Sequence, residues 1–174
     1  MSPFSNIADN LHRVRERIAR AAESTGRTED DITLVGVTKY VGPREAAELV
    51  AAGCRDLGES RPQALWQRAA DFQHIADVRW HLIGHLQRNK VRRTLPLVSM
   101  IHSVDSERLL AAIDEAQSEA ARDNDSSVDV LLEVNTSGEA AKHGLAPDAV
   151  EHLLTTAPRF RNVRICGLMT MAAL

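Results

Sequence analysis

The chain has 174 residues, of which 44% are hydrophobic and 26% charged, and 21 Lys and Arg against 24 Asp and Glu leave a formal charge of −3. These values are typical of a soluble globular protein and exclude long disorder, a collagen-like repeat and a polybasic nucleic-acid tail. The length suits one domain, although a closed eight-unit β/α barrel takes about 250 residues.

Cysteines and targeting signals indicate the cellular compartment. Cys54 and Cys166 are far apart, so we expect two reduced thiols near the core and no disulfide framework. Charges recur through residues 1–20, and no stretch approaches 18 uninterrupted apolar residues. The sequence therefore predicts a cytoplasmic protein that contacts no membrane.

Apolar periodicity predicts helices and strands in alternation. The first helix ends near Gly26, and its apolar residues recur every three or four positions: Ile7, Leu11, Val14 and Ile18. Further helices are predicted at 43–53, 62–72, 89–94, from about 105 to the polar run at 123–127, and 147–154. Strands are predicted at 32–37, 55–58, 78–83, 97–102, 128–134 and 163–168. The first strand is apolar on both faces, as in a covered parallel sheet.

Strands that alternate with helices predict βαβ units and a parallel sheet. Such a sheet is either open and doubly wound or closed as a β/α barrel. Residues 38–43, after the first strand, lack the glycine fingerprint of a dinucleotide-binding sheet. We therefore predict an α/β protein with one TIM-like (β/α) barrel domain over residues 1–174, with about six of the eight strands in this chain.

Polar residues recur where the predicted strands end, which is where parallel sheets place their chemistry. In chain order they are Lys39; Glu59, Ser60 and Arg61; His81, His85 and Gln87; His102, Ser103 and Asp105; Asn135, Thr136 and Ser137; and Thr170, beside Met169. This edge is the candidate site.

Lys39 carries the most information among these residues. A lysine that leaves a buried strand at a barrel mouth loses hydration, which favours the neutral amine. A neutral amine attacks aldehydes and forms a Schiff base with a carbonyl substrate or with pyridoxal phosphate. The alternative is a side chain that only reaches from the strand end to solvent.

Two other clusters favour simpler interpretations. His81 and His85 are four residues apart, but the first falls in a strand, the second lies beyond it, and no zinc motif is present, so no metal is expected. The basic residues between 88 and 93 lack interleaved aromatics, which favours a solvated helix face and no nucleic-acid partner.

Asn135 and Met169 are left with two interpretations each. The run 135–138 could hold a ligand oxygen with its amides and hydroxyls, or form a capped turn. Met169 either lines the barrel mouth or simply ends a strand.

Six segments in this order resemble the pyridoxal phosphate homeostasis protein family. They are residues 35–39, 57–60, 80–90, 101–106, 131–138 and 167–171, of which WHLIGHLQRNK at 80–90 is the most specific. The resemblance implies a fold-type III β/α barrel like the N-terminal domain of alanine racemase. It also implies pyridoxal phosphate held on Lys39 as a Schiff base, for cofactor homeostasis without catalytic turnover.

The resemblance leads to several expectations about site and function. We expect His81, Asn135 and Met169 to contact the cofactor beside Lys39, and the protein to be a monomer. The alternatives are a fold-type III enzyme, such as an amino-acid racemase or decarboxylase, and a cofactor-free Schiff-base lyase. A further alternative is that the chain as given binds nothing, because an open six-stranded barrel exposes two strand edges.

This sequence departs from the family in two places. Ser60 stands where the family usually has asparagine, so no role is carried over to it. The family also continues beyond the strand at 163–168 with loops that hold the phosphate, so we expect this chain to lack the last barrel units.

Overall fold

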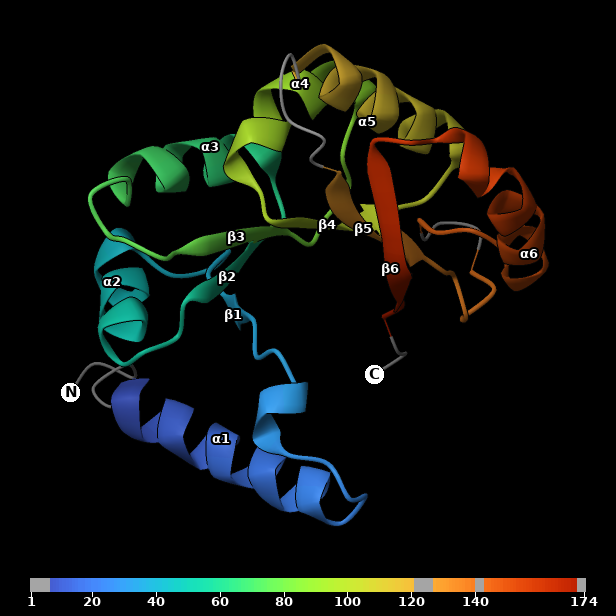
Figure 1. Ribbon diagram of the computed structural model, residues 1–174. Coiled ribbons are helices and arrows are strands. Elements are labelled where there is room, and N and C mark those ends of the chain that lie inside the picture. The colour runs from blue at the N-terminus through green and yellow to red at the C-terminus, as the bar shows by residue number, and fades with distance from the viewer. Residues whose placement is uncertain (1–6, 121–126, 140–142, 172–174) are drawn as a thin grey trace.

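A computed structural model describes residues 7–120, 127–139 and 143–171. Six strands form one sheet in chain order, and each strand pairs in parallel with the next (Figure 1). The strands are β1 (Gly36–Val37), β2 (Asp56–Glu59), β3 (Arg79–Leu82), β4 (Met100–Val104), β5 (Val128–Glu133) and β6 (Val163–Met169). This topology confirms the predicted α/β class and the six parallel strands.

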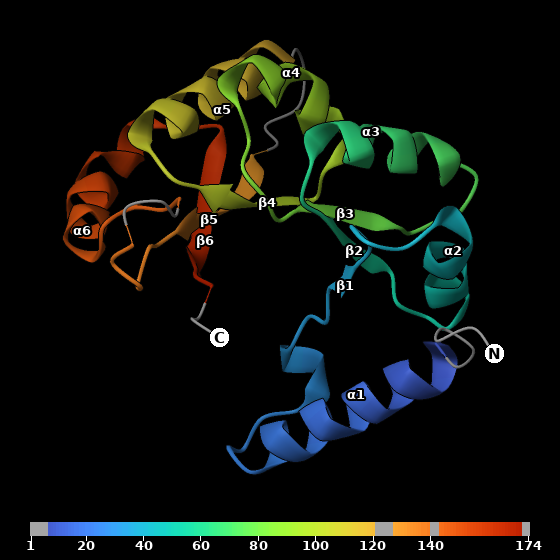
Figure 2. The same ribbon diagram turned by 180° about the vertical axis from the view of Figure 1, so that it is seen from behind.

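The helices form an arc around the outside of the curved sheet (Figures 1 and 2). They are α1 (Ile7–Glu23), α2 (Pro43–Ala51), α3 (Pro62–Asp71), α4 (Val91–Thr94), α5 (Glu107–Ala120) and α6 (Pro147–Thr156). Short 3-10 turns lie at Glu29–Asp31, Arg88–Lys90, Leu95–Leu97 and Ala157–Arg159. Within the described residues β1 and β6 are the outermost strands, so the barrel-like sheet is an open arc. No described helix has both the length and the apolar character needed to cross a membrane.

The hydrophobic core lies between the sheet and the outer helices. Side chains of β5 alternate: Val128, Val130 and Leu132 are buried, whereas the residues between them are only half-buried. Because successive side chains of a strand point to opposite faces, the buried set faces the helices. We call the opposite face of the sheet the inner face.

The first predicted strand is too long. Only Gly36 and Val37 form β1, and Ile32 and Val37 are 36% and 49% exposed. Within the described residues β1 pairs with β2 alone, and its Val37 side chain is exposed, so the face that carries Val37 is not covered as expected. Residues 29–31, just before the predicted strand, form a 3-10 turn that is capped by reciprocal contacts between Thr28 and Asp31.

Two further expectations need correction. The fourth strand begins at Met100, because residues 95–97 form a 3-10 turn around Pro96, which has no N–H to donate to a ladder. Cys54 is buried as expected, but Cys166 is exposed, since it lies on β6 at the edge of the sheet. Most of the predicted polar run at 123–127 lies outside the described residues.

Candidate functional site

Lys39 lies at the carboxyl end of β1. The Thr38 N–H extends the ladder by donating to the Gly58 carbonyl at 2.9 Å. Thr38 is buried while Val37 and Lys39 are exposed, and this alternation directs the lysine to the inner face. The amine lies 5.0 Å from the centre of the Tyr40 ring. The expected loss of hydration is therefore wrong, because the outermost strand leaves the side chain in solvent.

A buried network holds the backbone on either side of Lys39. Glu59, only 1% exposed, accepts a hydrogen bond of 2.7 Å from the Thr38 hydroxyl. Arg68 Nε lies 3.6 Å from the same Glu59 oxygen, and Arg68 Nη2 donates to the carbonyls of Thr38 and Val41. Residues of β2 and α3 thus hold residues 38–41 in place. Sequence reasoning placed Glu59 at a strand end but missed Arg68, which no local pattern marks.

His81 lies on the inner face in a hydrogen-bonded chain of side chains. Its Nε2 lies 2.9 Å from Asp56 Oδ1, and its Nδ1 lies 2.9 Å from His102 Nε2. With Asp56 ionised, His81 donates through Nε2, so a neutral His81 accepts from His102. Both nitrogens of the buried ring are engaged, which leaves its face as the surface that could meet a cofactor.

The protonation of His102 and Asp56 depends on the groups around them. Burial, and then the nearby His81, lower the pKa of His102 to about 4. Burial alone would raise the pKa of Asp56, but hydrogen bonds from Arg79 and His81 outweigh it and lower that pKa. Near neutral pH this part of the inner face therefore holds an ionised carboxylate and a neutral His102.

Asn135 and Met169 lie where β5 and β6 end. Asn135 Oδ1 accepts hydrogen bonds from the amides of Ser137 and Gly138, and its Nδ2 donates to the Glu139 carbonyl. These bonds match the turn interpretation of residues 135–138. Met169 is half-buried, and its carbonyl accepts the Val134 N–H at 2.8 Å.

The four residues expected to contact a cofactor are spread over the sheet. Lys39 follows the outermost strand at one edge, Met169 ends the outermost strand at the other, and His81 lies on β3 between them. Their contact with a ligand stays a prediction.

A second polar group occupies the carboxyl ends of β3 to β5. His85 Nδ1 lies 3.1 Å from Asp105 Oδ2, and His143 Nδ1 lies 3.8 Å from the same oxygen. Burial, and then the charge of Asp105, raise the pKa of the neighbouring Glu133. The strand-end pattern marked His85 and Asp105 but missed His143. Its only signal was a histidine beside Gly144 after a strand.

Part of the basic cluster at 88–93 has partners in the fold. Arg92 pairs with Glu119, and the Arg93 guanidinium lies 4.1 Å from the centre of the Trp66 ring. Arg92 and Arg93 are both exposed, which agrees with the predicted solvated helix face.

Comparison with known proteins identifies the class of domain first. Residues 5–174 match the family model described as alanine racemase, N-terminal domain. An alanine racemase of Clostridium difficile 630 has the same fold at 14% identity, with a TM-score of 0.68 over 95% of this chain and 41% of that one. The class is a TIM-barrel-like domain of the alanine racemase type.

Relatives with higher identity narrow the assignment. A pyridoxal phosphate homeostasis protein of Aquifex aeolicus is 37% identical over 166 residues, which are 95% of this chain and 71% of the relative. PipY of Synechococcus elongatus PCC7942, in a structure with pyridoxal phosphate bound, is 29% identical with a TM-score of 0.81, over 97% of this chain and 71% of that one. The chain belongs to the alanine racemase N-terminal domain family and, within it, to the pyridoxal phosphate homeostasis proteins.

Proposed function

We propose that the protein binds pyridoxal 5'-phosphate as a Schiff base on Lys39 and serves intracellular homeostasis of this cofactor. The observation that carries the proposal is the exposed Lys39 amine at the carboxyl end of β1, in a segment tied down by Glu59 and Arg68. Support comes from relatives named for pyridoxal phosphate homeostasis and from PipY, whose structure has the cofactor bound.

The described residues fit the aldehyde end of the cofactor. When bound, pyridoxal phosphate supplies an aldehyde that condenses with a primary amine and releases water. Lys39 offers that amine on the inner face. Glu59 and Arg68 position its backbone, so little backbone conformational entropy is lost when the side chain becomes attached.

Reduction with borohydride tests the attachment. Mixing the protein with pyridoxal phosphate is expected to shift the cofactor's absorbance to longer wavelength, and borohydride then fixes the label on the tryptic peptide 28–44, where a modified Lys39 blocks cleavage. Lys39→Arg keeps the charge but cannot form a Schiff base, so colour and label should vanish. The chain's other lysines are Lys90 and Lys142, and Lys90→Arg is the matched control. Label that persists in Lys39→Arg would overturn the proposal.

Turnover assays with several amino acids separate a carrier from an enzyme. We propose a carrier without turnover, so the holoprotein should neither racemise nor decarboxylate them. Activity that disappears in Lys39→Ala would favour a fold-type III enzyme. Trapping of a carbonyl substrate on Lys39 without cofactor would favour a lyase.

We also propose that the protein acts as a cytoplasmic monomer. Cys54 and Cys166 are both free thiols, as suits a reducing compartment. Size-exclusion chromatography with light scattering should report the mass of one chain, and a dimer mass would show this part of the proposal to be wrong.

A further inference from the structure

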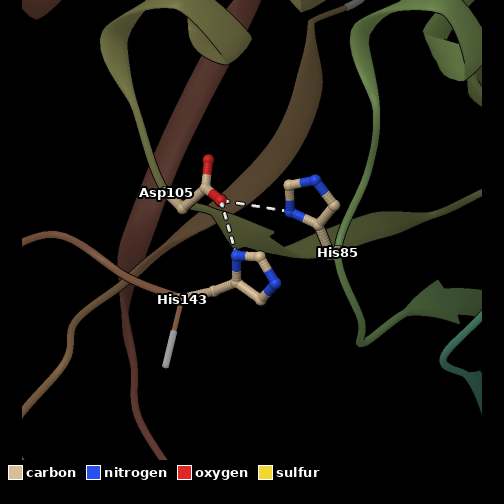
Figure 3. A group of neighbouring side chains, drawn as sticks. All are labelled: His85, Asp105 and His143. Atoms are coloured by element: carbon tan, nitrogen blue, oxygen red, sulfur yellow. Dashed lines mark hydrogen bonds and ion pairs between the residues drawn. The ribbon is translucent and has the colours of Figure 1, made fainter. Parts of the chain in front are cut away.

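Three side chains from separate parts of the sequence converge on one point, away from β1. His85, Asp105 and His143 each offer one ligand atom, and these atoms all lie within 4.8 Å of one another (Figure 3). Both imidazoles direct Nδ1 at the same carboxylate oxygen, at 3.1 and 3.8 Å. The longer separation is beyond hydrogen-bond reach, and the His143 ring stacks on the His85 ring with the two ring centres 4.3 Å apart.

Two glycines allow the histidines to reach this point. A Cβ on Gly84 would lie 2.3 Å from the Ser60 carbonyl oxygen, so only glycine lets the chain cross the end of β2 just before His85. Gly144 has a φ of +116°, and a Cβ there would lie 2.7 Å from the Asn135 amide nitrogen. The chain turns back at this glycine, and Leu145 donates its N–H to the Glu133 carbonyl at 2.7 Å. His143 is thereby held beside the end of β5.

Asp105 is fixed by the start of α5. Its Oδ1 lies 3.1 Å from the Ser106 hydroxyl, and Ser106 accepts the Leu109 N–H through both its carbonyl and its hydroxyl oxygen. The second carboxylate oxygen, Oδ2, faces the histidines. The carboxylate therefore presents one oxygen to the group and keeps the other for the helix.

We propose that His85, Asp105 and His143 bind a divalent transition-metal ion such as zinc. Two imidazole nitrogens and one carboxylate oxygen suit zinc and related ions, whereas magnesium and calcium prefer oxygen ligands alone. A tetrahedral zinc ion with bonds of about 2.0–2.1 Å holds its ligand atoms about 3.3 Å apart. The two Nδ1 atoms lie 3.1 and 3.8 Å from Asp105 Oδ2, and all three ligand atoms lie within 4.8 Å, so the side chains move closer together when the ion binds.

The exposure of the group gives the site an open side. The Asp105 side chain is 14% exposed, whereas His85 and His143 are 41% and 60% exposed. Water or a ligand oxygen can then complete the coordination. Because the three residues lie in the segments that follow β3, β4 and β5, the proposal does not depend on Lys39.

Metal titration of untagged, cofactor-free protein tests the site. Competition with a chromogenic zinc indicator should give one Zn²⁺ per chain, and Co²⁺ in its place should produce visible absorbance from its coordination. His85→Ala, His143→Ala and Asp105→Asn should each weaken binding by at least about 10-fold, since even outer-shell changes cost that much in metal sites. Circular dichroism checks that the variants remain folded.

Three controls make the result specific. His152→Ala removes an exposed histidine of α6, and Cys166→Ser removes the exposed thiol, so neither should change zinc affinity. Lys39→Arg should also bind zinc normally, which separates this site from the proposed cofactor site. Binding unchanged in all three ligand variants, or absent from the parent protein, would overturn the proposal.

Discussion

The two faces of the sheet differ in what they carry. On the helix-facing side Leu57, Leu82, Ile101, Val130 and Leu132 are fully buried. The inner face carries charged and titratable side chains: Asp56, Arg79, His81, His102, Asp129 and Arg164. Ions are costly to bury even in pairs, so these groups suit a face that meets water or a polar ligand. Stability is therefore expected to come mainly from one face and chemistry from the other.

Neighbouring leucines of β5 test this division most strongly. Leu132→Ala removes a side chain buried against the helices and should lower the free energy of unfolding by about 3 kcal/mol. Leu131→Ala is the same change on the inner face, where the side chain is half-buried, and should cost about 1 kcal/mol. Urea denaturation followed by circular dichroism measures both. Equal losses would show that the inner face is packed as tightly as the outer one.

The buried network behind Lys39 gives the next largest effect. Arg68→Met leaves the Glu59 carboxylate buried beside no cation and should destabilise the fold by about 3 kcal/mol or slightly less. It should also weaken cofactor binding, because residues 38–41 lose two hydrogen bonds. Denaturation and cofactor titration measure the two effects.

The matched control for Arg68 is an arginine in an exposed pair. Arg44 pairs with Glu48 on α2 at 3.0 Å, and Arg44→Met should change little. Adding Glu59→Gln to Arg68→Met should recover part of the stability, because the uncompensated charge is gone. Equal effects of Arg68→Met and Arg44→Met would show that the network does not support the lysine.

Local pattern predicted the alternation of elements and the position of Lys39, because apolar runs and turn residues mark strands whatever their partners. It could not predict which distant side chains meet. Arg68 reaches Glu59 from the next helix, and His143, which follows β5 in the sequence, reaches Asp105, which follows β4. Nor could it predict the length of β1, since the number of neighbouring strands decides how much of an apolar run joins the ladder.

A smaller effect depends on pH. Unfolded His102 takes up its proton near pH 6.5, whereas the folded pKa is about 4. The unfolded chain binds more protons between these values, so stability is full above about pH 6.5, falls as pH decreases to about 4 and then levels off. The whole shift corresponds to about 3 kcal/mol, and solvent screening of a half-buried ring reduces this to about 1–2 kcal/mol.

His102→Gln isolates that contribution. The amide can still donate to His81 but does not titrate in this range, so this variant should lose less stability than the parent between pH 7 and about pH 4. Urea midpoints of both proteins across this window give the difference. Parallel curves would show that the folded ring takes up its proton as readily as the unfolded one.

The smallest effect tests whether the inner face is open to solvent. Arg164 donates to both oxygens of Asp129 at 2.6 and 2.7 Å, and its side chain is 67% exposed. Arg164→Gln should shift the urea midpoint only slightly, and the shift should disappear in about 1 M salt, where the screening length is about 3 Å. Asp129→Asn should behave alike, since it breaks the same pair. A large shift that salt leaves unchanged would mean that the Arg164–Asp129 pair is shielded from water. The inner face at β5 and β6 would then be covered in solution, and the difference between the two faces would not hold there.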